Sequence, residues 1–109
     1  MSRTRAITAD ELRKLLRQLD DPARLAVRIA ADTGLRISDI LAIRPGDLAE
    51  KMVITERKTG KKRTVRLRPA TLKAAKAYSR YSGKFLIDRD RSTIYRQVRA
   101  AAEDLGLSH

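Results

Sequence analysis

The stretch TGLRISDILAIRPGDL, residues 33–48, decides the fold class of this sequence. Gly34 follows a helical pattern and predicts its end, because glycine readily adopts the left-handed conformation that closes helices. Arg36 then leads into a short helix, predicted over about Ser38 to Ile43, and Arg44-Pro-Gly-Asp47 predicts a turn. The stretch therefore predicts two helices that meet at a glycine, with an arginine at the start of the second.

Two helices are expected before Gly34. Thr8-Ala-Asp-Glu11 is a capping-box pattern that opens the first of them. The second is expected to start with Asp21 as its cap and Pro22 in its first turn, and to run to about Thr33. The apolar residues that recur at helical spacing along these two helices are Leu12, Leu15, Leu16, Leu19, Leu25, Ala26, Ile29 and Ala30.

The hydrophobic pattern changes from helical to alternating after about residue 50. Met52–Glu56 and Arg63–Leu67 alternate as strands do, and they flank Lys58-Thr-Gly-Lys61, a short turn with a glycine. The segment of about residues 50–68 therefore predicts a small antiparallel β-hairpin.

Two more helices are predicted after the hairpin. Residues 70–81 are helical in pattern, and so is a final segment that Ser92 caps and Gly106 closes. A short apolar segment, Phe85-Leu-Ile87, joins them. No repeat or linker is visible, so the 109 residues predict one α+β domain, mainly helical with a small antiparallel sheet.

The charge of the chain favours a polyanionic partner. Lysine and arginine number 25 against 13 aspartates and glutamates, which gives a net charge of +12. Each phosphate that a cation neutralises releases condensed counterions, so this excess favours binding to nucleic acid. The aromatic content of 4% is low for a platform that stacks RNA bases, and double-stranded DNA is the expected partner.

The composition argues against several other classes of protein. The absence of cysteine excludes disulfides and thiolate metal sites, and a single histidine, His109, argues against a histidine-built metal site. The sequence predicts no cofactor. It contains no apolar run long enough to span a bilayer, and its start lacks the apolar stretch of a signal peptide. A cytoplasmic protein with no membrane partner is therefore expected.

The order of these elements resembles the first part of the catalytic domain of tyrosine recombinases, the phage integrase family. Thr33-Gly-Leu-Arg36, followed by Asp39, is similar to the family's first catalytic arginine and the acidic residue after it. Lys58 in the hairpin turn and Val65-Arg-Leu67 in the second strand are similar to the next motifs. The joint order and spacing carry the resemblance, which covers nearly the whole chain.

The resemblance implies DNA strand exchange, in which a tyrosine attacks a phosphodiester and forms a 3′-phosphotyrosyl link. It implies that Arg36 binds the phosphate and that Lys58 protonates the leaving 5′-oxygen. A guanidinium suits this role because its planar fork meets two phosphate oxygens and stays charged. Asp39, one helical turn after Arg36, is expected to hold that arginine in one rotamer. The nearby cations expected to bind DNA are Arg57, Lys61, Lys62 and Arg63.

The same residues also have plainer interpretations. Arg36 would simply pair with Asp32 or Asp39 on the surface, and Lys58 would be one more solvated charge in a basic run. The tyrosines are interpreted as helix-face or core residues; they are Tyr78, Tyr81 and Tyr95.

The family's second set of catalytic residues is expected after about residue 107, and the sequence ends at His109. We therefore expect residues 1–109 to form a single, C-terminally incomplete integrase-like catalytic domain, without the family's N-terminal core-binding domain. Without the second arginine and the nucleophilic tyrosine, the chain alone is expected to be inactive. Three interpretations stay open: a fragment of a recombinase, a DNA-binding regulator or accessory to a full-length recombinase, and a protein-interaction module that forms homo-oligomers through an exposed apolar face.

Overall fold

Helices and one hairpin make up residues 8–106, the part of the chain that the computed structural model describes. The expectation of a mainly helical α+β fold with a small antiparallel sheet is confirmed. The regular elements are α1 (Ala9–Arg17), α2 (Asp21–Thr33), α3 (Ile37–Leu41), β1 (Lys51–Thr55), β2 (Lys62–Arg66), α4 (Pro69–Tyr78) and α5 (Arg91–Asp104). Two single turns of 3-10 helix are η1 (Pro45–Asp47) and η2 (Ser79–Tyr81).

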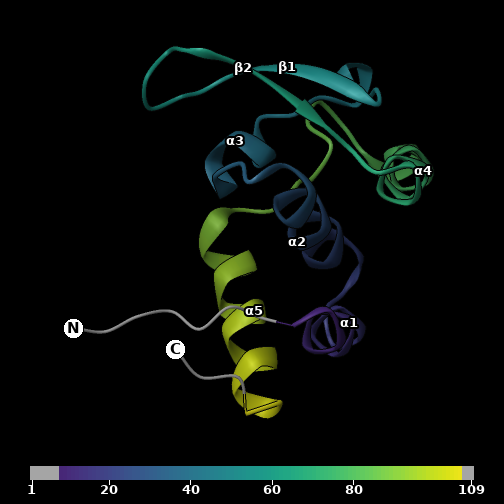
Figure 1. The fold of residues 1–109 in the computed structure, drawn as a ribbon, viewed down its shortest axis with the longest axis vertical. Helices are drawn as coiled ribbons and strands as arrows, with labels where there is room; N and C mark the ends of the chain where they lie inside the picture. The colour runs from purple at the N-terminus through teal and green to yellow at the C-terminus, as the bar shows by residue number, and fades with distance from the viewer. Residues whose placement is uncertain (1–7, 107–109) are drawn as a thin grey trace.

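Helix α2 runs through the middle of the molecule and contacts most other elements (Figure 1). The hairpin lies at one end with α3 beneath it, and α1 lies at the opposite end beside α5 (Figure 1). Ile29 on α2 is fully buried among the other core side chains, because its helical face meets α3, α4 and α5. The other large side chains that are fully buried are Ile40, Ile43, Leu67, Leu86 and Ile87.

The capping box at the start of α1 is confirmed. The Thr8 amide donates to Glu11 Oε1 over 3.0 Å, and the Glu11 amide donates to Thr8 Oγ1 over 3.1 Å. The apolar segment of residues 85–87 is tied to the core, since the Leu86 amide donates to the Ile43 carbonyl over 2.8 Å.

Two of the predicted helix caps are wrong. Helix α2 is capped by Asp20, whose Oδ1 accepts from the Ala23 amide over 3.2 Å, and the expected cap Asp21 is the first helical residue. Helix α5 is capped by Asp90 in place of Ser92. Asp20 also accepts from Arg89 and from Gln97 on α5, so contacts remote in sequence favour it as the cap.

We expect Asp20→Ala to lower the free energy of unfolding by about 1–2 kcal/mol at neutral pH, because it removes a helix cap and the links to α5. The matched control is Asp21→Ala, which removes only an exposed ion pair with Arg24 and should cost less than about 0.5 kcal/mol. Chemical denaturation measures both. Equal costs for the two variants would contradict the cap assignment.

The same substitution should also change how stability depends on pH. Partial burial raises the pKa of the Asp20 carboxyl, but hydrogen bonds from the Ala23 amide, Gln97 and Arg89 outweigh this and hold the pKa below its ordinary value of 3.8. A carboxyl with a lowered folded pKa stabilises above its unfolded pKa, and the benefit is lost as the pH falls through the folded value. The difference between wild type and Asp20→Ala should therefore shrink below about pH 4.

The hairpin is confirmed, with both strands starting one residue earlier than predicted. Lys51 pairs with Arg66 and Thr55 with Lys62, and Met52 and Ile54 point into the core. The connecting loop, residues 57–60, is closed by a hydrogen bond that the Glu56 amide donates to the Lys61 carbonyl over 2.8 Å. Gly60 takes a left-handed conformation, with φ at 73°, which returns the chain to β2.

The other expectations about local structure hold with small changes. Helix α3 begins at Ile37, one residue earlier than predicted, and α4 ends at Tyr78 before the η2 turn. Tyr78 is partly buried, whereas Tyr81 and Tyr95 are exposed and lie outside the core. No helix within residues 8–106 has the length and apolar character needed to cross a membrane.

Candidate nucleic-acid interface

The three residues before Arg36 fix the conformation of the turn that leads to it. Thr33 Oγ1 donates to the Ile29 carbonyl over 2.7 Å and accepts from the Leu35 amide over 3.1 Å. Gly34 has φ at 72°, as predicted, and its amide donates to the Ala30 carbonyl over 2.8 Å. Leu35 is buried in the core, which fixes the direction of the chain after α2. Arg36, the next residue, is exposed at the surface.

Arg36 is the residue that precedes the first turn of α3. Its carbonyl accepts from the amides of Asp39 and Ile40, each over 3.0 Å. Its side chain is exposed, and it makes no hydrogen bond or ion pair with any residue of the described range 8–106. The ion pair with Asp32 or Asp39 that the sequence suggested is therefore not formed. The N–H donors of the Arg36 guanidinium have no acceptor among the described residues.

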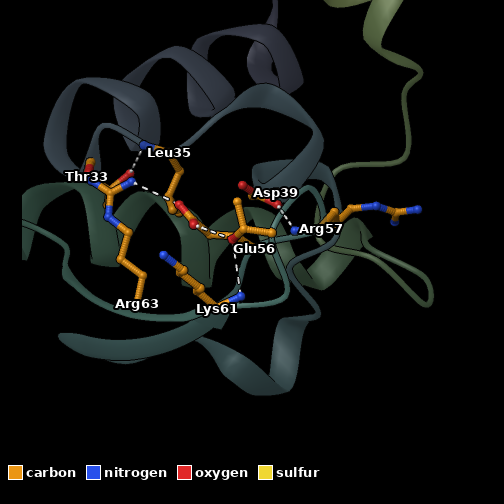
Figure 2. A network of polar contacts seen from close by, with 8 residues as sticks. Thr33, Leu35, Asp39, Glu56, Arg57, Lys61 and Arg63 are labelled. Atoms are coloured by element: carbon orange, nitrogen blue, oxygen red, sulfur yellow. Dashed lines mark hydrogen bonds and ion pairs between the residues drawn. The ribbon is translucent and has the colours of Figure 1, made fainter.

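Asp39 contacts the hairpin, whereas the sequence suggested a contact with Arg36. The residue is 3% exposed, and its Oδ1 accepts from the backbone amide of Arg57 over 2.9 Å (Figure 2). Figure 2 also shows the Arg57 side chain extending away from this contact. A buried carboxylate must be hydrogen-bonded, and here the entry to the hairpin loop supplies the donor. The bond holds Arg57, the residue before Lys58, against helix α3.

Arg63 on β2 makes a second link between the hairpin and this turn. Its Nη2 donates to the Thr33 carbonyl over 3.0 Å, at the C-terminus of α2, where a cation is favoured (Figure 2). Its Nη1 lies 3.7 Å from Glu56 Oε2, and 42% of the side chain is exposed. The structure thus directs the Arg63 guanidinium toward protein oxygens, although the sequence suggested DNA.

The hairpin loop is ordered by a small network of its own. Thr59 Oγ1 donates to Glu56 Oε1 over 2.9 Å and accepts from the Lys61 amide over 3.2 Å (Figure 2). The loop therefore has a defined backbone around Lys58. Lys58 and three of the four cations expected to bind DNA are exposed and have no side-chain partner among the described residues; those three are Arg57, Lys61 and Lys62.

An apolar groove of about 310 Å³ lies beside Arg36, between α2, α3 and α5. Ile37, Ile94 and Tyr95 contribute to its walls. The sequence alone does not predict this groove, because the α5 residues that line it are nearly 60 positions beyond Arg36 and no local pattern indicates that the two are neighbours. The groove gives the arginine an apolar wall on one side, which strengthens electrostatic interactions at its rim.

The fold is similar to solved recombinase structures. The lambda integrase catalytic core matches with a TM-score of 0.77 and 24% identity, over 97% of this chain and 72% of that one. A lambda integrase dimer bound to a COC′ core site matches with a TM-score of 0.79 and 23% identity, over 100% of this chain and 37% of that one. XerA recombinase matches with a TM-score of 0.75 and 21% identity, over 94% of this chain and 44% of that one. At these identities the matches show the fold alone.

The sequence itself gives a family assignment. No curated protein sequence matches this chain. The chain spans less than half the length of lambda integrase residues 75–356 and of XerA, and so corresponds to part of these proteins. The sequence pattern of the phage integrase family matches residues 5–109, nearly all of the chain. With that match and this fold, the chain belongs to the phage integrase family of tyrosine recombinases and has part of their catalytic-domain fold.

Proposed function

We propose that this chain binds double-stranded DNA as part of a site-specific tyrosine recombinase, with Arg36 and Lys58 directed to one phosphate. The observation that carries the proposal is the Asp39 bond to the Arg57 amide. The Asp39 amide donates to the Arg36 carbonyl, and Arg57 immediately precedes Lys58. Two hydrogen bonds and the peptide link between Arg57 and Lys58 therefore connect the two cations. Both side chains are exposed, and neither has a hydrogen-bond or ion-pair partner among the described residues.

The two cations suit different parts of phosphoryl transfer. A pentacoordinate phosphate gathers negative charge on its non-bridging oxygens, and a guanidinium meets two of them with its planar fork. Lys58 is an ammonium on a loop, and it donates the proton that the leaving 5′-oxygen needs, which a guanidinium does poorly. In this proposal Asp39 positions the loop, while Arg57, Lys61 and Lys62 contact neighbouring phosphates.

We further propose that the chain contributes phosphate-binding groups to the reaction and leaves the nucleophile to other residues of a complete recombinase. Tyr95 lines the groove beside Arg36. We assign it a structural role in the wall of that groove and not the role of the nucleophile. A nicked DNA substrate that traps covalent intermediates should therefore yield no adduct with this chain. A DNA–protein adduct lost in Tyr95→Phe would contradict this part of the proposal.

Relatives of similar fold support DNA and other subunits as partners. One matched structure is a lambda integrase dimer on a core site, and another is a lambda integrase tetramer on a Holliday junction. By analogy, this chain meets DNA beside other copies or beside a full-length recombinase. We also propose that it binds DNA in the cytoplasm.

We expect Arg36→Ala and Lys58→Ala each to weaken duplex binding about three- to tenfold at moderate salt. Each should also lower the slope of log K against log salt by about 1, since one phosphate contact is lost. Fluorescence anisotropy with a labelled duplex over a salt series measures both quantities. Arg99→Ala is the control: it removes the same charge from an exposed site in the second half of α5. The C-terminal end of that helix lies at the opposite end of the molecule from the hairpin (Figure 1). If all three variants behave alike, DNA does not meet Arg36 and Lys58 specifically.

A further inference from the structure

Another cavity lies between α2 and α4, on a different face of α2 from the groove beside Arg36. Its volume is about 350 Å³, and its walls come from the first turns of α2, the second half of α4 and the η2 turn. The α2 residues that line it recur at helical spacing and share one face of the helix, whereas the groove uses other positions. We call it the α2–α4 cavity; it shares no residue with Arg36, Asp39 or the hairpin.

The α2–α4 cavity contains two arginines that have no protein partner. Its third arginine, Arg24, is satisfied: Nη1 lies 2.8 Å from Asp21 Oδ1, and its other nitrogens donate to two backbone carbonyls. Arg28 and Arg80 make no hydrogen bond or ion pair with any residue that the structure describes. Arg28 is also only partly exposed, and a guanidinium partly withdrawn from water favours an anion as its partner. Since Arg24 neutralises Asp21, the cavity keeps two unpaired positive charges.

Two tyrosines give the α2–α4 cavity an aromatic wall. The ring centroids of Tyr78 and Tyr81 are 6.3 Å apart with an interplanar angle of 60°, an edge-to-face contact. Tyr78 is partly buried, whereas Tyr81 is 82% exposed. Leu25, Ala74 and Ala77 add apolar surface. Tyrosine and arginine are the residue types enriched where proteins bind one another most tightly, so this wall is typical of a protein-binding site.

We propose that the α2–α4 cavity binds a short acidic segment of a partner protein. One apolar or aromatic side chain of that segment fills the cavity, and neighbouring carboxylates pair with Arg28 and Arg80, whose planar forks match them. A duplex fits this place poorly, because its phosphates form a broad convex surface and the cavity is concave and partly apolar. A second copy of the chain is disfavoured by the net charge of +12 that each copy carries.

The proposed partner is therefore a different and more acidic protein. Because the α2–α4 cavity uses none of the residues proposed to bind DNA, this inference goes beyond the proposed function and does not depend on it. The chain could hold such a partner and a duplex at the same time.

A labelled peptide with one phenylalanine between two pairs of glutamates tests the inference by fluorescence anisotropy. Arg28→Ala and Arg80→Ala should each weaken peptide binding about five- to tenfold, and Tyr81→Ala about threefold. Lys58→Ala and Arg99→Ala are the matched controls: each removes one positive charge elsewhere and should cost less than about twofold at moderate salt. Arg80 and Tyr81 are exposed, so their variants test the site even where Arg28→Ala disturbs the fold.

Several results would overturn the inference. The peptide would bind through net charge alone if all four charge variants lost affinity equally, and a peptide that does not bind would remove the site altogether. In duplex binding, Arg28→Ala and Arg80→Ala should behave like Arg99→Ala; a larger loss would assign the cavity to a DNA phosphate. A dimer in light scattering that Arg80→Ala abolishes would assign it to a second copy. By contrast, duplex binding unchanged in Arg36→Ala and Lys58→Ala would contradict the proposed function and leave this inference standing.

Discussion

Asp39→Ala is expected to lower the free energy of unfolding by about 2–3 kcal/mol and to loosen the hairpin loop. The carboxylate is buried and accepts the Arg57 amide over 2.9 Å, a hydrogen bond to a charged acceptor that is worth about 1.5–3 kcal/mol. Its removal leaves the Arg57 amide without its acceptor and a small void beneath the loop. Because the contact joins residues 18 positions apart, its loss also uncouples Lys58 from the helix behind Arg36.

Hydrogen exchange of the Arg57 amide is the most direct measurement, and it should become faster in Asp39→Ala than in wild type. Asp39→Asn should recover part of the stability, since its amide oxygen accepts the same bond without the charge. Asp47→Ala is the matched control: Asp47 also accepts a backbone amide, from Arg44 over 2.9 Å, but the contact is exposed and local. Unchanged Arg57 exchange in Asp39→Ala would mean that the loop is held by other contacts. Duplex binding should weaken in Asp39→Ala, because the loop no longer presents Lys58 in one place.

Local signals in the sequence predicted most of the elements but not all of their ends. The capping box at Thr8 and the left-handed Gly34 depend on residues within four positions, and both are confirmed. The caps at Asp20 and Asp90 were missed. For Asp20 the reason is clear, since Arg89 and Gln97 bind its carboxylate from about 70 positions away, and spacing rules contain no such information.

The site was predicted in the same uneven way. The position of Arg36 at a glycine-ended turn follows from local rules, whereas the partner of Asp39 depends on how the hairpin folds back over α3. The convergence of Arg36 and Lys58 on one phosphate stays a prediction. A signal for Arg63 was present but unused: it precedes the buried Val65 by two residues, and side chains two apart share a strand face. That alternation directs Arg63 inward and Lys62 outward, as the structure has them.

Gly34→Val is expected to cost about 2–4 kcal/mol of stability, more than a change of one small residue would suggest. The backbone at Gly34 has φ at 72°, which costs a β-branched residue about 1–3 kcal/mol. A Cβ there would also lie 3.3 Å from Arg63 Nη2, the atom that donates to the Thr33 carbonyl. The substitution therefore strains the turn and pushes against the link between the hairpin and α2, which should weaken DNA binding as well.

Gly60→Val separates these two effects. Gly60 has nearly the same φ, 73°, but a Cβ there meets nothing within 4 Å, so its cost reports backbone strain alone. Thermal or chemical unfolding of the two variants should show Gly34→Val as the more destabilised by about 1 kcal/mol, the value of a typical hydrogen bond. In an Arg63→Ala background that excess should disappear, because the guanidinium that the new Cβ crowds is already gone. An excess that persists without Arg63 would mean that the strain lies elsewhere in the turn. The Arg63 bond to the Thr33 carbonyl would then not help to position Arg36.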